Sequence, residues 1–432
     1  MNPELRRNLW LELSLHRALA APVGLGLIFL LVYKLSETDP GGPISITAAT
    51  LFVAFALWAG VQAGDSVHSE VRARTWDGQR MSAIEPWAMT WGKLAGTPAF
   101  AWYGAALCFI VYLIASPEPT APRIALFMLA GMCLLAAMAL IGSIVAARKA
   151  LARTSSSAWV LGIVLVFVGP WMSVLSASDA DIGWWGRSWG RIDFLLASTA
   201  LFAAWGVLGA HRLMCQELRV RTAPWAWVAF LLFASAYIAG FGIRFHDTFG
   251  QGRSVLLIAG LIVSMASIYP LLFSEASGAM AVRRMLLRVA AKDWRRLLQE
   301  TPLWPVSLAL AFVFCALTVL LVGPRTGDND LFRAAVLAPI PLFLLATRDV
   351  AIYLFFALAR QARRAEAATI IYLLLLYWLV PMLLGVAGAK GVADLVLPPF
   401  WERPGFAAIV AAVQAAAVVG ATLWRWRKNY GS

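Results

Sequence analysis

The chain has 432 residues, of which 61% are hydrophobic and only 14% are charged, and its mean hydropathy is +0.74. One soluble core could not bury so much apolar surface, so the composition excludes an ordinary soluble domain. The formal net charge of +13 would suit a soluble nucleic-acid-binding protein, so the placement of the basic residues decides how this charge is interpreted.

The apolar residues form about twelve runs that are each long enough to cross a bilayer, since a spanning helix needs roughly 20 mostly apolar residues. The predicted spans are residues 18–34, 44–63, 95–115, 124–147, 157–177, 193–213, 223–242, 254–273, 303–323, 333–358, 368–388 and 405–424. Little besides loops remains. We therefore predict an all-α polytopic membrane protein.

The basic residues are unevenly divided between the two sides that these spans define. With a cytoplasmic N-terminus, 25 of the 36 lysines and arginines fall in the inner segments, whereas the acidic residues divide evenly. An excess of basic residues in cytoplasmic loops is a topology signal of membrane proteins. We expect a multi-pass protein of the inner or plasma membrane, with both termini in the cytoplasm and no nucleic-acid partner.

Residues 1–17 precede the first predicted span. Leu5, Leu9 and Leu13 share one helical face, and the arginines lie elsewhere. This pattern predicts a helix in the inner interface of the membrane, with a solvated extension as the alternative.

A charged segment, Gly64 to Gly96, separates the second and third predicted spans. Asp77-Gly78 predicts a turn between two short helical pieces, and Glu85-Pro86 predicts the start of the second piece. Trp76 and Trp87 are apolar side chains of the kind that anchor protein interfaces. The segment is therefore a candidate contact surface for a partner protein.

A second charged segment, Ser274 to Pro302, follows about 210 residues later. Its basic residues recur every fourth position, and an apolar stripe runs beside them, which predicts one amphipathic helix along the cytoplasmic face. The basic positions are Arg284, Arg288, Lys292 and Arg296, and the apolar ones are Leu287, Ala290, Trp294 and Leu298. The helix would contact either a partner protein or anionic lipid headgroups, and the sequence leaves both open.

The two halves of the chain show signs of a repeat. An offset of 211 residues superposes Arg153 on Arg364 and Pro170 on Pro381, so a basic cluster, an apolar run and a proline recur in spans five and eleven. We predict a tandem duplication of a six-helix unit, with residues 1–221 as the first copy and residues 222–432 as the second. Six spans is an even number, so the two copies would be parallel.

Two longer outer loops, residues 176–193 and 387–405, occupy the same place in each half. The first contains Trp184, Trp185 and Trp189, and the second contains Trp401. Aromatic rings of this kind gather at headgroup level, so we expect short helices at the outer surface in both loops.

Catalytic motifs are missing from the sequence. The fragment Gly92-Lys93 lacks the upstream glycine and the Ser or Thr of a phosphate-binding loop. The four histidines are scattered, and no HExxH motif or paired outer carboxylates suggest a metal or hydrolase site. We expect no catalytic residues, no metal and no cofactor in this chain.

The order of residues in the Gly64 to Gly96 segment resembles the permease subunits of type-2 ABC exporters, the ABC-2 family. The corresponding loop of that family reads approximately E-x-E, G-T-L/W-[DE], T-P-L-S and then G-K-L at the next span. This chain departs from the pattern at Arg74, where the family has glycine, and at Ala83, where it has proline. Six spans and an N-terminal interfacial helix also match over residues 1–221, and the second half keeps this architecture without the motif.

The resemblance implies two permease halves fused in one chain. The cytoplasmic loops would couple to two separate ABC ATPase subunits, which would bind ATP and Mg²⁺. The coupling residues that the resemblance implies are Glu70, Thr75, Trp76, Asp77, Pro86, Gly92 and Lys93 in the first loop, and Arg284, Arg288, Lys292 and Arg296 in the second. The exported substrate is not indicated by any residue of this sequence.

Arg348 and Asp349 lie inside the tenth predicted span. A charge there costs at least ~2.5–3.5 kcal/mol on insertion scales and marks a pathway or a pair facing the bundle. Adjacent helical residues do not face each other, so we expect each to reach another helix. The alternative is that the span breaks early and places both at the cytoplasmic interface.

Two other function classes remain open. A twelve-helix secondary transporter needs charged coupling residues at mid-membrane, and only Arg348 and Asp349 qualify. A membrane scaffold without transport is the third class.

Overall fold

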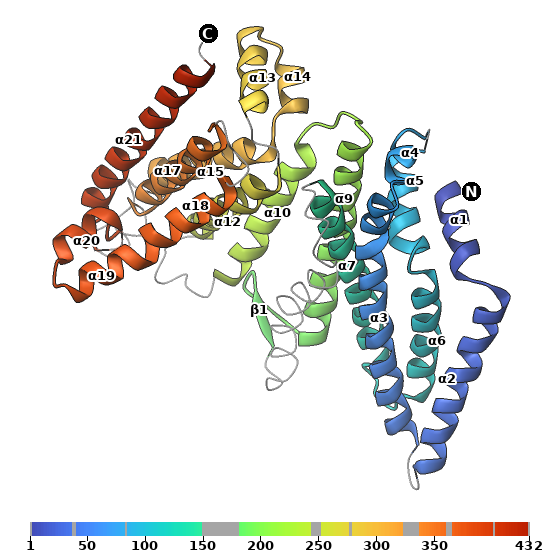
Figure 1. Cartoon of the computed structure of the whole chain (residues 1–432). Helices are drawn as coiled ribbons and strands as arrows, with labels where there is room; N and C mark the ends of the chain where they lie inside the picture. The colour runs from blue at the N-terminus through green and yellow to red at the C-terminus, as the bar shows by residue number, and fades with distance from the viewer. Residues whose placement is uncertain are drawn as a thin grey trace. The chain divides into compact units, whose positions relative to one another are not determined.

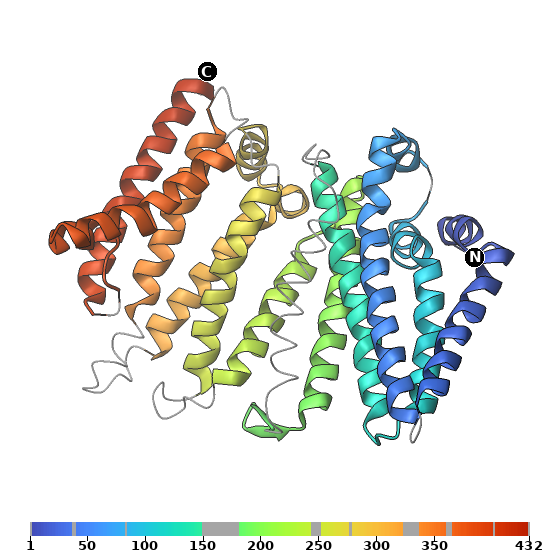
Figure 2. The same cartoon turned by 60° about the horizontal axis from the view of Figure 1, so that its bottom comes forward.

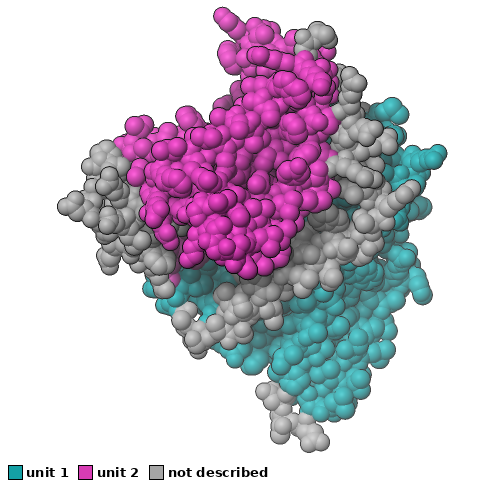
Figure 3. Space-filling view, turned by 60° about the vertical axis from the view of Figure 1, so that its left-hand side comes forward, with its two compact units in different colours: residues 1–182, 188–222 teal, residues 183–187, 223–432 magenta. Residues whose placement is uncertain are grey.

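The computed structural model describes residues 2–36, 40–82, 84–148, 181–242, 252–275, 279–322, 337–359, 365–400 and 402–430. By its internal contacts the chain divides into two compact units (Figure 3). Unit 1 comprises residues 1–182 and 188–222, and unit 2 comprises residues 183–187 and 223–432. Figure 1 labels the helices and strands of both units.

Unit 1 begins with a short helix that precedes the first long one. Its helices are α1 (Pro3–Glu12), α2 (Leu15–Leu35), α3 (Gly41–Arg72), α4 (Trp76–Arg80), α5 (Pro86–Trp91), the π-helix η1 (Gly92–Gly96), α6 (Ala99–Ala115), α7 (Ala121–Arg148) and α9 (Arg191–Glu217). The predicted helix before the first span is confirmed, since α1 is separate from α2.

Small residues let the long helices of unit 1 pack closely. Helix α3 packs against α6 and α7, and α7 packs against α9. A Cβ added at Gly60 would lie 2.9 Å from Leu135, and one added at Gly104 would lie 2.4 Å from Phe55. Glycine and alanine at such contacts are typical of membrane helices, where van der Waals packing replaces the hydrophobic effect as the force between helices.

Unit 2 contains a second set of long helices. Its helices are α10 (Trp225–Gly242), α12 (Gly252–Ser274), α13 (Ala279–Ala290), α14 (Trp294–Glu300), α15 (Leu303–Val322), α17 (Pro339–Ala357), α18 (Ala365–Leu374), the π-helix η5 (Leu375–Leu379), α19 (Val380–Val386), α20 (Lys390–Val396) and α21 (Pro404–Tyr430). Helix α12 packs against α10 and α15, and α17 packs against α21. At the α12–α15 contact, Gly260 leaves room for the ring of Phe314.

Ten helices of the described residues are long and apolar enough to cross a membrane. The helical segments Pro86–Gly96 and Ala99–Ala115 are bent by 58° relative to each other, and the number of candidate spans is eleven if they are counted together as one span. The prediction of an all-α polytopic membrane protein is confirmed. Each predicted span overlaps one of these helices except residues 157–177, which lie outside the described residues, as do Arg153, Pro170, Arg364 and Trp401.

One predicted outer helix is wrong. Residues 182–189 form a hairpin of two short strands, β1 (Ile182–Trp184) and β2 (Arg187–Trp189). Trp185 and Gly186 turn the chain with φ angles of 50° and 72°, a left-handed pair that suits a two-residue hairpin turn. In the other outer loop, the short helix α20 agrees with the prediction.

Candidate coupling site

Lys93 is the buried centre of a charge cluster in unit 1. Its ammonium group lies 3.2 Å from Glu4 Oε1 and donates a hydrogen bond to Glu70 Oε1, and its side chain is 0% exposed. Arg7 Nη2 contacts the same two carboxylates, at 2.8 Å from Glu4 Oε1 and 3.1 Å from Glu70 Oε1. Two cations therefore balance two anions, which is the condition under which buried charges are tolerated.

Neutral side chains complete this cluster, which we call the Lys93 cluster. Gln79 Nε2 donates to Glu70 Oε1 at 2.6 Å, and Asn8 Nδ2 donates to Glu4 Oε1 at 3.3 Å. The ring of Trp76 lies 5.9 Å from the Lys93 ammonium group, in cation–π range. The cluster joins α1, the end of α3, α4 and η1 with one network of charge-assisted hydrogen bonds.

Glycine lets α1 lie directly on η1. A Cβ at Gly92 would lie 2.3 Å from Glu4 Cγ, and a Cβ at Gly96 would lie 2.9 Å from Asn8 Cβ. Asn8 Nδ2 also donates to the Gly92 carbonyl at 3.0 Å. The glycine of the Gly92-Lys93 pair thus has a packing role, since only the absence of a side chain allows this approach.

The loop that follows α3 begins with a left-handed residue. Arg74 has φ = 58°, and the N–H of Thr75 donates to the carbonyl of Glu70 at 3.0 Å, closing the end of the helix. This is the C-terminal capping geometry that favours glycine. Arg74 therefore occupies a position that requires left-handed backbone.

The predicted coupling residues of unit 1 divide into buried and exposed groups. Lys93, Gly92 and Trp76 are buried, with Trp76 only 5% exposed, and Glu70 and Pro86 are partly buried. The exposed surface comes from the loop around them: Arg72, Arg74, Thr75, Asp77, Met81, Glu85 and Trp87. Trp76 therefore packs in the core beneath the loop, and its ring is not accessible to a partner protein.

Two local expectations for this loop have different outcomes. Asp77-Gly78 does not separate two helical pieces, because both residues lie within α4, which ends at Arg80, and α5 begins only at Pro86. Pro86 does begin α5, with Glu85 as the preceding cap residue. Trp87 stacks on His211 of α9 with ring centroids 3.8 Å apart, which holds α5 against that helix.

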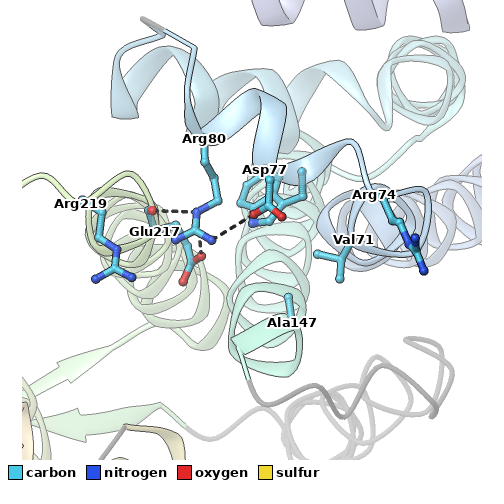
Figure 4. Close-up of a pocket in the computed structure, with 8 residues that line it drawn as sticks. Val71, Arg74, Asp77, Arg80, Ala147, Glu217 and Arg219 are labelled. Atoms are coloured by element: carbon cyan, nitrogen blue, oxygen red, sulfur yellow. Dashed lines mark hydrogen bonds and ion pairs between the residues drawn. The ribbon is translucent and has the colours of Figure 1, made fainter. Parts of the chain in front are cut away.

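A pocket of about 590 Å³ opens beside α4, at the ends of α3, α7 and α9 (Figure 4). Arg80 crosses it: its Nε donates to the Glu217 carbonyl at 3.1 Å, and its Nη1 lies 3.5 Å from Asp77 Oδ1. The side chains of Arg74 and Arg219 point away from Arg80 in Figure 4. Arg80 Nε also lies 3.9 Å from Glu217 Oε2, so an ion pair crosses the pocket and links α4 to the end of α9.

The corresponding segment of unit 2 is built differently. The predicted continuous amphipathic helix is wrong, because Lys292 adopts φ = 53° and Asp293 caps a new helix by accepting the N–H of Arg296 at 3.2 Å. Helices α13 and α14 form a hairpin that Arg288 and Glu300 tie together at 3.3 Å. The fourfold spacing of Arg284, Arg288, Lys292 and Arg296 therefore does not place them on one face.

Arg348 and Asp349 form a second buried cluster, in the middle of α17. Arg348 Nη2 lies 2.9 Å from Asp349 Oδ1, and the two side chains are 3% and 1% exposed. Asp349 Oδ2 also accepts hydrogen bonds from Tyr269 at 2.9 Å and Tyr377 at 2.7 Å, and Arg348 Nη1 donates to Gln414. The cluster joins α17 to α12, η5 and α21.

The expectation for this pair is corrected in one respect. Each residue reaches other helices as predicted, but the two also bond to each other, because the long guanidinium fork of Arg348 turns back to the neighbouring carboxylate. Helix α17 runs unbroken from Pro339 to Ala357, so the pair does not lie at an early helix end.

Sequence reasoning missed the partners that complete both clusters: Glu4, Arg7, Asn8, Gln79, Tyr269, Tyr377 and Gln414. The one available signal was polar residues on a helix predicted to lie in the interface, opposite its leucines. No group of three His, Cys, Asp or Glu side chains in the described ranges could hold a metal ion. Neither family models, curated proteins nor solved structures give a match to this chain.

Proposed function

We propose that this chain is the transmembrane permease component of an ATP-driven ABC exporter of the type-2 kind, coupled through cytoplasmic loops to separate ATPase subunits. The observation that carries the proposal is the Lys93 cluster. It fastens an exposed loop to three helices that lead into the membrane, namely α2 through α1, α3, and α6 through η1. A movement of that loop would therefore be transmitted to the membrane-spanning helices through these charged contacts.

The length of α3 supports a docking surface outside the bilayer. Its 32 residues extend roughly 48 Å, whereas the hydrocarbon core is about 30 Å thick. Glu70 near its end can therefore lie beyond the lipid, with the α4–α5 loop still farther out. Among the exposed side chains that this loop offers to a partner, Met81 is 83% exposed and the Asp77 carboxylate is also largely exposed.

The remaining parts of the proposal follow from the sequence. Residues 1–221 and 222–432 would be two parallel six-helix copies that enclose one translocation path. The protein would lie in the inner or plasma membrane, with both termini in the cytoplasm. ATP and Mg²⁺ would be bound by the partner subunits, which would move the loops toward each other on closing. The absence of a phosphate-binding loop in the sequence supports this division of labour.

The test is a titration of the ATPase that co-purifies with the chain from its native membrane. Met81→Glu should weaken binding of the ATPase at least tenfold and uncouple its ATP turnover, since it changes only an exposed side chain. Glu118→Lys is the matched control, because Glu118 is exposed in the loop between α6 and α7, at the other end of the spans. If no ATPase co-purifies, or if both variants behave alike, the proposal fails.

A secondary transporter is the second candidate, and the buried pair Arg348 and Asp349 favours it. Ionisable residues inside a membrane commonly serve ion or proton coupling. The two candidates separate cleanly in proteoliposomes: the exporter requires ATP and its partner, whereas the secondary transporter requires only an ion gradient across the vesicle.

A further inference from the structure

The α13–α14 hairpin is held close to the ends of two apolar helices. The link from α12 to α13 is residues 275–278, and the link from α14 to α15 is residues 301–302. Links this short reach at most roughly 15 Å. Glu275 Oε2 also accepts the N–H of Leu303 at 2.6 Å, which ties the two links together at the base of the hairpin. Since α12 and α15 are long and apolar enough to cross a membrane, their insertion would place the base of the hairpin at headgroup level.

The hairpin also runs across the direction of the spans. In Figure 2, α13 and α14 are seen nearly end-on, whereas α12 and α15 of the same unit extend across the picture. Figure 1 shows the converse, with α13 and α14 seen from the side. Helices that run across the spans, at the ends of those spans, have the orientation of helices that lie in a membrane interface.

The apolar residues of the hairpin are uncovered. Leu286 is 52% exposed, Val289 45%, Trp294 59% and Leu298 41%, and α14 has no buried residue. Helix α13 separates its apolar and charged faces more strongly than any spanning helix of the described chain. Large apolar side chains in this number are costly in water, and the apolar phase nearest to them is the bilayer that α12 and α15 enter.

The charge of the hairpin is strongly basic. Residues 279–300 contain six basic and two acidic side chains. Arg288 is paired with Glu300, and Arg296 is paired with Asp293. Among the described residues, no ion pair is formed by Arg283, Lys292 or Arg295, all of which are exposed. These cations are complementary to the negative surface of a leaflet that contains anionic lipids.

We propose that the α13–α14 hairpin is a binding surface for anionic lipid headgroups. Its leucines and Trp294 insert at the boundary of the acyl chains, and Arg283 and Arg295 contact the phosphates. Burial of an apolar face with attraction of basic side chains to anionic lipid is the combination that holds amphipathic helices to membranes. The proposal depends only on membrane insertion of unit 2, and failure of the ATPase proposal would leave it standing.

The experiment places a fluorescent probe on the apolar face of the full-length chain. Leu286→Cys, in a background with the four native cysteines replaced by alanine, is labelled with an environment-sensitive dye. The protein is reconstituted into phosphatidylcholine vesicles and into vesicles with about one third phosphatidylglycerol, each with a shallow nitroxide lipid as quencher. We expect a blue-shifted, quenched probe in the anionic vesicles, less quenching in the neutral ones, and a decrease in quenching as salt is raised.

The charge variants decide whether the basic residues are responsible. The double variant Arg283→Glu, Arg295→Glu should weaken membrane binding of the hairpin. We expect its partition coefficient into anionic vesicles to fall roughly fivefold for each cation removed. Lys390→Glu with Arg403→Glu makes the same change of charge elsewhere in unit 2 and should have no effect. Equal quenching in both vesicles, unaltered by the first pair, would overturn the proposal. Shielding of the probe that appears only after the ATPase is added would overturn it in favour of a protein partner.

Discussion

The loop between α3 and α6 in unit 1 and the hairpin between α12 and α15 in unit 2 have similar composition and opposite construction. Both are basic, both contain tryptophan, and both turn at a basic residue with left-handed backbone, Arg74 or Lys292. In unit 1 the lysine of the loop is fully buried among carboxylates. In unit 2 the cations and the leucines face outward. Charge content alone therefore does not decide whether such a segment becomes part of a core or a surface.

Helix α1 accounts for the difference. It supplies Glu4, Arg7 and Asn8 to the loop of unit 1 and covers η1 at Gly92 and Gly96. Before α10 of unit 2, residues 218–224 form no helix. The hairpin of unit 2 consequently has no helix equivalent to α1 packed on it. The buried ion pair of that unit, Arg348 and Asp349, lies instead within a predicted span.

The largest expected effect is the removal of the central cation of unit 1. Lys93→Met leaves Arg7 as the one cation of the cluster beside the carboxylates of Glu4 and Glu70, and breaking a buried ion pair from one side costs about 3–5 kcal/mol. Thermal unfolding of the purified chain should show this loss. Arg295→Ala in the hairpin is the control and should leave the melting temperature unchanged. Equal losses in the two variants would contradict the comparison.

The buried pair of unit 2 should behave as a structural contact. Asp349→Asn leaves Arg348 without its counterion and should lower stability by about 3 kcal/mol. Thermal unfolding and transport are measured together in the same preparation. If Asp349→Asn kept full stability but abolished ion-driven transport, the pair would be a coupling site, and the secondary transporter would displace the exporter.

Close packing of α1 is tested at Gly92. Gly92→Ala places a methyl group 2.3 Å from Glu4 Cγ, and overpacking of this kind costs about 2 kcal/mol. Gly78→Ala, whose new methyl group would meet no atom within 4 Å, is the matched control and should keep or slightly raise stability. Protease sensitivity of the N-terminal helix should increase in the first variant alone.

The smallest expected effect concerns the feature that the two loops share. Arg74→Gly and Lys292→Gly relieve left-handed strain at 58° and 53°, and each should raise stability by about 0.5 kcal/mol. Paired melting curves of the two variants are the measurement. A loss of stability at Arg74 alone would mean that its side chain, and not only its backbone, is needed in unit 1.

The sequence by itself determined the spans and their helical state. Runs of about twenty apolar residues can satisfy their backbone hydrogen bonds in lipid only as helices, so residues 18–34 and 44–63 become α2 and α3. It also located the charged segments and the start of α5 at Pro86, because proline is favoured at the first turn of a helix. These properties depend on neighbouring residues along the chain.

Only the tertiary structure decided which charged residues are buried. Lys93 and Lys292 are both lysines of basic segments, and no local pattern separates them. Lys93 is paired with the carboxylates of Glu4 and Glu70, which other helices supply. Lys292 has no ion-pair partner among the described residues. The same holds for Asp349, whose carboxylate is satisfied by Tyr269 and Tyr377. A charge is tolerated away from water only where a partner is brought to it, and the packing of distant helices determines where that happens.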